Sequence, residues 1–222
     1  MLLEEAQWIG NILGRYERHQ ISPILNMGSG THYFRTVVQP HIDRYIFEER
    51  RKRSIDVVHC DMKMEDGVDI AGDMFDPDCQ RRLAVHNFKC ILLTNLLEHL
   101  HPERRHKVCS ILTAIMDKQS LLIITVPFSF PYHPDPIDTM FRPEPTEIAQ
   151  IFPNFELVSS AIVSSNTYVQ VLRTMNAGKV AKSVLRLFVP FYKFDLWLGC
   201  MHNLLWLYRP YSVSCLVLAR RT

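Results

Sequence analysis

The stretch Ile24-Leu25-Asn26-Met27-Gly28-Ser29-Gly30 holds the most informative pattern in this chain: a short apolar run, a polar residue and two glycines one residue apart. Such a run predicts a buried strand that ends in a tight turn before a helix. Glycine lets the backbone of this turn adopt positive φ angles and approach a ligand where a side chain would collide. A glycine pair alone indicates only a turn, so its meaning depends on the segments that follow.

Three later segments are short strand-forming runs that end on polar side chains. They span 56–61, 68–73 and 90–95, and they end on Asp61, Asp73 and Asn95. The continuous apolar residues of the third segment favour a central parallel strand covered on both faces. In doubly wound sheets, ligands bind beside the carboxyl ends of the strands. Asn26 and the three later polar residues are all predicted there, which is a stronger indication of a ligand site than any single motif.

Strand and helix patterns alternate along the chain. Strands are predicted near 23–27, 56–61, 68–73, 88–95, 119–128, 155–165 and 212–220, and helices near 2–18, 33–50, 77–86, 103–117 and 144–152. This alternation predicts a single α/β domain over residues 1–222, with a doubly wound, mostly parallel seven-stranded sheet and helices on both faces. The N-terminal helix, within 1–20, is expected to pack on the sheet or over the ligand.

Residues 166–210 interrupt this alternation before the last strand. They are rich in Leu, Val, Phe and Trp with interspersed Lys and Arg, and Pro190 and Asp195 divide the apolar runs. No run reaches the roughly 20 apolar residues that span a bilayer. We expect an apolar helical insertion that packs on its own domain and partly covers the pocket. Two alternatives remain for residues 179–207: a homodimer surface or substrate lid, or a helix lying peripherally on a membrane.

The composition is that of an ordinary globular protein, with 47% hydrophobic and 22% charged residues. The net charge of +2 gives no reason to expect nucleic-acid binding. The six cysteines include no Cys-x-x-Cys pair, a pattern that favours a reducing compartment and no metal site. Glu4 and Glu5 interrupt the first apolar run, so no signal peptide is expected and the predicted location is cytoplasmic.

With these signals in order, the chain resembles the class I S-adenosylmethionine-dependent methyltransferases, in particular the small-molecule type with Leu-Glu-His after the fourth strand. The similarity covers residues 22–158 and the last strand. The first motif of that family resembles 26–30 here, its ribose-binding acid resembles Asp61, its adenine-flanking pair resembles Asp73-Met74, and its fourth motif resembles 94–99. The resemblance implies a Rossmann-like methyltransferase fold, a small-molecule substrate and S-adenosyl-L-methionine as cofactor. The cofactor-binding residues it implies are Asn26, Met27, Gly28, Gly30, Asp61, Met62, Asp73, Met74 and Asn95.

The chain departs from the family pattern at three places. Asn26 stands where an acid is usual, His32 stands at the third glycine position, and Asp117-Lys118-Gln119-Ser120 replaces a Pro-Gly-Gly turn. Asparagine can accept a hydrogen bond from the cofactor's ammonium group but brings no negative charge. A non-catalytic partner subunit that keeps the fold therefore remains an alternative. A dinucleotide oxidoreductase is disfavoured, because Tyr33 occupies the last position of Gly-x-Gly-x-x-Gly.

Candidate catalytic residues follow the predicted fifth strand. His133 is a candidate general base because histidine titrates near neutral pH, and Tyr132 or Asp138 could orient the substrate. The competing interpretation is a proline-stiffened loop in which His133 and Asp138 only bond to backbone. Glu98 and His99 are neighbours that point in different directions, so they are expected to cap a helix or line the pocket floor.

Overall fold

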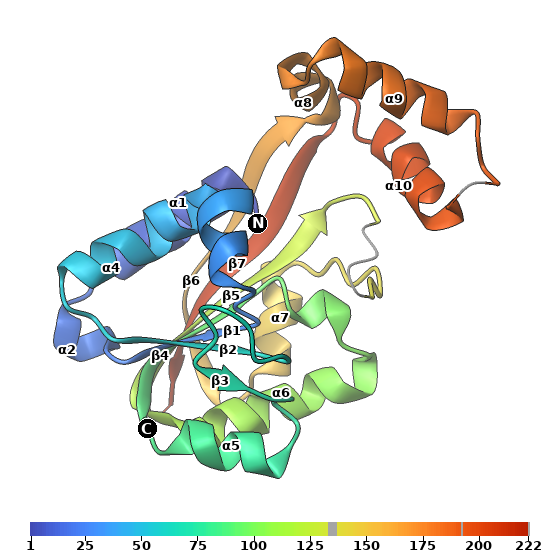
Figure 1. Ribbon diagram of the computed structural model, residues 1–222. Helices are drawn as coiled ribbons and strands as arrows, with labels where there is room; N and C mark the ends of the chain where they lie inside the picture. The colour runs from blue at the N-terminus through green and yellow to red at the C-terminus, as the bar shows by residue number, and fades with distance from the viewer. Residues whose placement is uncertain (133–136, 192, 222) are drawn as a thin grey trace.

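The computed structural model describes residues 1–132, 137–191 and 193–221, and it contains one seven-stranded sheet with helices on both faces (Figure 1). The strands are β1 (Ile24–Met27), β2 (Val57–Asp61), β3 (Ile70–Ala71), β4 (Phe88–Thr94), β5 (Met116–Ser129), β6 (Phe155–Thr167) and β7 (Pro210–Arg220). Their order is β3-β2-β1-β4-β5-β7-β6. β7 lies between β5 and β6 and runs antiparallel to both, and all the other neighbouring strands are parallel. The predicted doubly wound, mostly parallel sheet is confirmed.

Helices cover the two faces of the sheet separately (Figure 1). One face carries α1 (Leu3–Gly14), α2 (Arg18–Ile21) and the segment η1 (Phe34–Val38), α3 (Pro40–Ile42), η2 (Asp43–Phe47) and α4 (Glu48–Lys52). The other carries α5 (Pro77–Ala84), α6 (Pro102–Ile115) and α7 (Pro145–Ile151). A short turn, η3 (Leu97–His99), follows β4.

The single helix predicted over 33–50 is wrong, because the structure has four short segments there. Pro40 explains the main break, since proline has no amide hydrogen and its ring clashes with the preceding turn. Gln39 adopts a non-helical conformation with φ −129° and ψ 69°. Wide turns on either side of the break, η1 and η2, replace regular helix. The interrupted segment forms a curved cover over the carboxyl end of β1.

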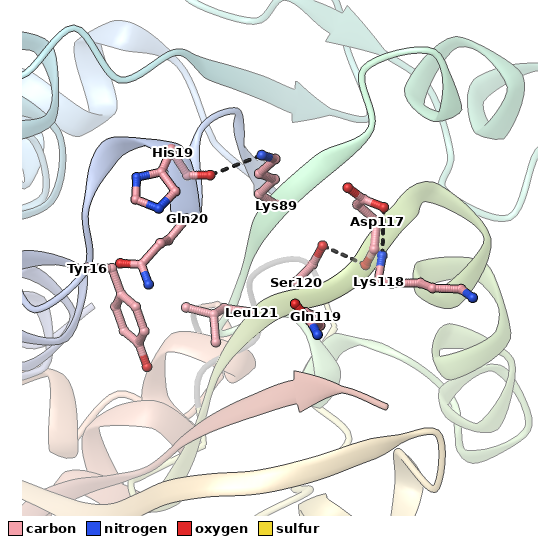
Figure 2. A pocket seen from close by; sticks show the side chains of 9 residues that line it. All are labelled: Tyr16, His19, Gln20, Lys89, Asp117, Lys118, Gln119, Ser120 and Leu121. Carbon is pink, nitrogen blue, oxygen red and sulfur yellow. Dashed lines mark hydrogen bonds between the residues drawn. The ribbon is translucent and has the colours of Figure 1, made fainter. Parts of the chain in front are cut away.

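The start of β5 is irregular where the sequence lacks the Pro-Gly-Gly turn. The register with β4 jumps from the pair Phe88–Met116 to the pair Cys90–Leu121, so residues 117–120 bulge outward. A cavity of about 400 Å³ lies beside this bulge (Figure 2). Lys89 Nζ donates to the His19 carbonyl at 3.0 Å, and Ser120 Oγ donates to the Asp117 carbonyl at 2.6 Å. The cavity lies at the amino ends of β4 and β5, the edge of the sheet opposite the glycine turn.

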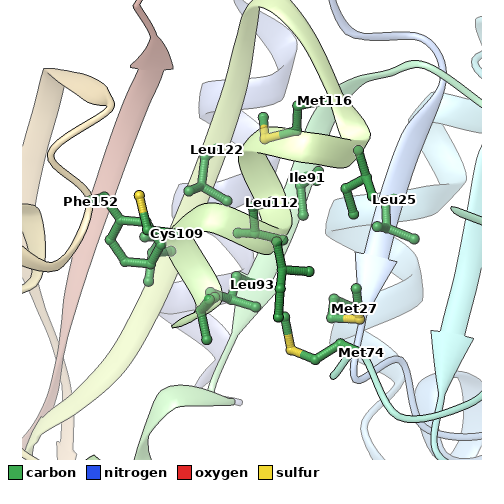
Figure 3. Close-up of a cluster of buried hydrophobic side chains, with 14 of the residues drawn as sticks. Leu25, Met27, Met74, Ile91, Leu93, Cys109, Leu112, Met116, Leu122 and Phe152 are labelled. Carbon is green, nitrogen blue, oxygen red and sulfur yellow. The ribbon is translucent and has the colours of Figure 1, made fainter. Parts of the chain in front are cut away.

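Alternating strand residues supply the two halves of the core. Leu25 and Met27 pack with α5, α6 and α7, and Figure 3 shows this half, in which Leu112 and Phe152 meet the strands. Ile24 packs with α1 and η2 on the opposite face. Because side chains alternate along a strand, Asn26 shares the face of Ile24 and lies beneath α1 and η2. This alternation directs the polar residue of the first motif to the face that carries the pocket.

Three helices between β6 and β7 form the predicted insertion: α8 (Tyr168–Thr174), α9 (Ala177–Leu187) and α10 (Phe194–Leu204). They project beyond the sheet at the end of the long β6–β7 ribbon (Figure 1). Trp206 is buried, whereas α9 has no buried residue and packs against α10. In the part of the chain that the structure describes, each helix is too short or too polar to cross a bilayer.

Candidate functional site

The turn after β1 has the conformation that the two glycines predict. Gly28 has φ +71° and Gly30 has φ +62°, values that side-chain-bearing residues adopt at a cost. The amides of Gly28 and Ser29 both donate to the Cys60 carbonyl, at 2.9 and 3.0 Å. A Cβ atom on Gly28 would lie 2.8 Å from Leu96 Cδ1. The turn is therefore tied to β2, and the side chains of Leu96 and Phe34 pack against its two glycines.

Asp61, at the end of β2, holds the same turn from the other side. Its Oδ2 accepts a hydrogen bond from the Gly30 amide and its Oδ1 accepts one from the Met62 amide, both at 2.7 Å. Each carboxylate oxygen has a further lone pair for a ligand hydroxyl. The Met62 side chain is exposed, so its amide is the part of the residue that enters the arrangement.

Arg35, which the sequence analysis did not single out, fixes the far side of the turn. Its buried guanidinium donates to the carbonyls of Ser29 (3.1 Å), Gly30 (2.6 Å) and Gly67 (2.8 Å). Burial lowers the pKa of Arg35, and nearby carboxylates, Asp43 first among them, oppose that shift. Because the Arg35 guanidinium donates hydrogen bonds to three carbonyl oxygens, the glycine turn is held in place before any ligand binds.

A cavity of about 270 Å³ opens between the ends of β1 and β4, beneath α1 and the curved cover. Its polar lining includes Asn26, Gly28, Ser29, Thr94, Asn95 and His99, and its apolar lining includes Phe34, Ile42, Ile46, Phe47 and Leu92, with Met1 and Gln39 at the edge. The strands on either side of β1 connect in opposite directions, so this is the crevice where doubly wound sheets bind ligands. The cavity thus unites three residues of the sequence-predicted site: Asn26, Gly28 and Asn95.

Asn26 at the cavity floor is paired with a neutral histidine. Its amide nitrogen lies 3.1 Å from His59 Nδ1. Burial, followed by the charge of Arg35, lowers the pKa of His59 to about 4, so the imidazole is uncharged at neutral pH. The pair contributes no charge to the floor, and the carbonyl oxygen of Asn26 is its remaining acceptor.

Asn95 is held at the cavity wall by an acidic residue from the N-terminal helix. Asn95 has φ +49°, and its amide donates to Glu5 Oε1 at 2.7 Å. The same oxygen accepts from Thr125 Oγ1 at 2.6 Å, and Oε2 accepts from the Leu2 amide. Buried Glu5 therefore fastens α1 across the carboxyl ends of β4 and β5. Sequence reasoning treated Glu5 only as a break in an apolar run.

The remaining cofactor candidates lie outside this cavity. The side chains of Met27 and Met74 are buried in the core half shown in Figure 3, so only their backbone can face a ligand. Asp73 Oδ1 accepts from the Phe75 amide at 3.0 Å, and Oδ2 lies 3.4 Å from Arg104 Nη1. The predicted place of Asp73 and Met74 beside the adenine therefore stays a prediction, with the Met74 side chain in the core.

Two of the three catalytic candidates after β5, Tyr132 and Asp138, do not line the cavity. His133 falls outside the described residues. Tyr132 packs edge-on against His202 of α10. Asp138 is buried and paired with Arg142, whose Nη2 lies 2.6 Å from Oδ2, and its Oδ1 also accepts from the Met140 amide. Asp138 therefore anchors the segment after β5 through a side-chain ion pair as well as a backbone hydrogen bond.

Glu98 and His99 have different surroundings, although His99 Nε2 lies 3.9 Å from Glu98 Oε1. His99 lines the cavity, and its Nδ1 lies 2.5 Å from the Ile137 carbonyl. The Glu98 carboxyl is fully buried, and neither oxygen has a hydrogen-bond partner within the described residues. Burial raises the pKa of Glu98 to about 8. Over the same residues, no cluster of three or more His, Cys, Asp or Glu side chains is arranged to hold a metal ion.

Comparison with known proteins supports the fold. No protein-family model and no curated protein sequence matches this chain. The solved structure of coclaurine N-methyltransferase bound to N-methylheliamine and SAH has a TM-score of 0.56 and 12% identity, over 97% of this chain and 72% of that one. The cyclopropane synthase MmaA2 from Mycobacterium tuberculosis has a TM-score of 0.52 and 13% identity, over 96% and 83%. The cyclase SpnF has a TM-score of 0.53 and 12% identity, over 97% and 81%.

The sheet order and these likenesses define the class of fold. The chain has the Rossmann-like fold of the class I S-adenosylmethionine-dependent methyltransferases. At these identities the likeness concerns the fold, and one of the similar structures is described as a cyclase. The reaction must therefore be argued from the site itself.

Proposed function

We propose that this protein is an S-adenosylmethionine-dependent methyltransferase that acts on a small-molecule acceptor in the cytoplasm. The observation that carries the proposal is the turn at Gly28 and Gly30, which Arg35 and Asp61 hold in place and whose residues Gly28 and Ser29 line a cavity at the crevice between β1 and β4. The cytoplasmic placement is supported by six unpaired cysteines, five of them buried.

The residues around the turn have the chemical groups that the successive parts of the cofactor need. Asn26, Gly28 and Asn95 would hold its amino-acid end, because they line the cavity and offer backbone, carbonyl and amide groups. Asp61 would accept the ribose hydroxyls at the end of β2. The backbone around Asp73 would border the adenine. When bound, the cofactor supplies a methyl group on a positively charged sulfur, an already activated leaving group.

The protein's part in such a reaction is mainly positioning. The apolar side chains of Phe34, Ile46 and Phe47 cover the cavity and would exclude water from a reacting pair. Glu5 and Arg35 fix the two walls in advance, so less conformational freedom is lost when reactants bind. His99 is the titratable side chain of the cavity lining that could accept a proton from the acceptor.

Ligand-linked stabilisation tests the proposal directly. At a hundredfold excess over the dissociation constant, S-adenosylmethionine or S-adenosylhomocysteine should stabilise the fold by about 2.7 kcal/mol and raise Tm by roughly 5–10 °C. NAD should leave Tm unchanged. Stabilisation by NAD alone would contradict the proposal, and methyl transfer from labelled S-adenosylmethionine to a metabolite extract would establish the activity.

Asp61→Ala should weaken S-adenosylmethionine binding by roughly 1.5–3 kcal/mol without unfolding the protein, because a charge-assisted pair of hydrogen bonds is lost. Isothermal titration measures the effect. Asp56→Ala, at the opposite end of the same strand system, is the matched control and should bind normally. Unchanged affinity of the Asp61 variant would remove this carboxylate from the ribose site.

A second candidate, a non-catalytic partner subunit that still binds the cofactor, is favoured by the uncharged Asn26–His59 pair. If this missing charge limits cofactor binding, Asn26→Asp should tighten S-adenosylmethionine binding about tenfold, because the carboxylate attracts the ammonium group. The same carboxylate would raise the pKa of His59 from about 4, which NMR titration can follow. An Asn26→Asp variant that binds no better would show that this position does not limit cofactor binding.

A further inference from the structure

The helix α9 carries an exposed apolar surface that its own domain leaves uncovered. Successive helical residues are rotated by about 100°, so Ala181, Val184, Leu185 and Phe188 fall within one arc of about 100°. Phe188 is 78% exposed, and Phe191, just beyond the helix, is fully exposed. Val180 and Leu187 lie on a different side of the helix, and the Leu187 carbonyl accepts a hydrogen bond from Trp197 of α10. We call the exposed arc together with Phe191 the α9 apolar face.

Positive charge is concentrated beside this face. Residues 166–210 contain six basic residues and one acidic residue, Asp195, whereas the whole chain has a net charge of only +2. Lys179, Lys182 and Arg186 fall within about 60° of one another on α9, next to the apolar arc. Within the described residues, none of these three cations forms an ion pair. The segment offers a net charge of +5 with few internal counter-ions.

A second copy of this chain fits the surface poorly. In a symmetric dimer each patch meets the same patch of its partner, so unpaired cations of both copies would approach one another. An anionic lipid surface supplies what is missing: negative head groups for the cations and an apolar interior for the phenylalanine rings. Helices that lie in a membrane interface typically carry aromatic residues on one side and Lys or Arg on the other.

We propose that α9, together with Phe191 just beyond it, forms a docking surface for an anionic lipid bilayer. The α9 apolar face enters the boundary between head groups and acyl chains, and Lys179, Lys182 and Arg186 contact the phosphates. The insertion projects away from the sheet, so it can reach a membrane without distorting the fold (Figure 1). The surface is distinct from the cofactor crevice, so the proposal does not depend on methyl transfer.

Vesicle flotation of the full chain tests the proposal. The protein should float with vesicles of phosphatidylcholine that contain about 30% phosphatidylglycerol, and much less with phosphatidylcholine alone, because the head-group charge attracts the cations. About 0.5 M salt should release most of the bound protein, since the electrostatic attraction is then screened within a few ångströms.

Two double variants separate the two parts of the surface. Lys179→Gln with Lys182→Gln should lower the partition coefficient on anionic vesicles roughly 25-fold, at the usual attraction for each lost charge. Phe188→Ser with Phe191→Ser should lower it more than about 100-fold. The matched control combines Val85→Ser with Lys107→Gln on α6. Both residues lie outside the insertion, and Val85 is an apolar residue that is 75% exposed. The control should partition as the wild type does, and circular dichroism should show all variants folded.

The proposal is overturned if the wild type fails to float with anionic vesicles at low salt, or if both double variants still float like the control. Sedimentation velocity gives an independent decision. A concentration-dependent dimer that Phe188→Ser with Phe191→Ser dissociates, in a protein that ignores vesicles, would assign the α9 apolar face to a second copy.

Discussion

Gly28→Val should abolish S-adenosylmethionine binding, with a loss of more than about 100-fold in affinity. Two effects act together. Valine at φ +71° is strained, because its Cβ meets the following carbonyl and its branched side chain has few rotamers. The Cβ would also lie 2.8 Å from Leu96 Cδ1, so the turn or Leu96 must shift, and Gly28 itself lines the cavity. Isothermal titration should detect no heat of binding at concentrations that saturate the wild type.

Gly14→Val is the matched control. Gly14 ends α1, and a Cβ atom there would meet nothing within 4 Å. This variant should bind normally and unfold at nearly the wild-type temperature. The Gly28 variant should remain folded but lose about 1–3 kcal/mol of stability. Near-normal binding by folded Gly28→Val protein would exclude the glycine turn from the cofactor site.

The fold was predictable because its signals are local. Apolar runs of strand length at 24–27 and 88–94 mark central strands, and the polar residue that ends each run marks the carboxyl edge of the sheet. Asn26, Gly28 and Asn95 were placed in the pocket by this reasoning and do line the cavity. Pro40 was also visible in the sequence, and a proline inside a predicted helix indicates a break. The prediction nevertheless continued one helix through it.

Long-range polar contacts were not predictable in the same way. Glu5 meets Asn95 and Thr125, which lie 90 and 120 positions away in the sequence, and Arg35 binds the carbonyl of Gly67. Periodicity identifies which face of an element is buried but not which polar group will be found there. A charged residue at a position that the helical pattern marks as buried, as with Glu5 and Arg35, is the available signal for such a contact.

The insertion shows the same limit for apolar contacts. The sequence predicted its helices and its basic, aromatic composition. It could not show that Trp206 would be buried against Ser129, where the indole donates at 3.0 Å, while Phe191 would be fully exposed. Composition sets how much apolar surface a segment carries, and only the three-dimensional arrangement shows how much of it remains uncovered.

The buried carboxyl of Glu98 makes the stability of the protein depend on pH. Groups from several elements surround it: Glu5 of α1, neighbouring His99, and Asp138 and Arg142 of the segment after β5. Burial is the main cause of its raised pKa, the charge of Glu5 adds to the shift, and Arg142 opposes it. Neither carboxyl oxygen has a hydrogen-bond partner within the described residues, so ionisation would leave a desolvated charge uncompensated.

Glu98→Gln should therefore stabilise the protein by about 3–5 kcal/mol above pH 8 relative to the wild type, and leave the two nearly equal at pH 4.5. The folded pKa of about 8 lies above the unfolded value of 4.5, so the folded wild type binds the extra proton between these values and loses stability as the pH rises through them. Urea unfolding across this range measures the difference. Glu103→Gln, at an exposed acid at the start of α6, should give a small difference that does not change with pH. If the difference in unfolding free energy between Glu98→Gln and the wild type also stays the same across this pH range, burial does not hinder the ionisation of Glu98 in the folded protein.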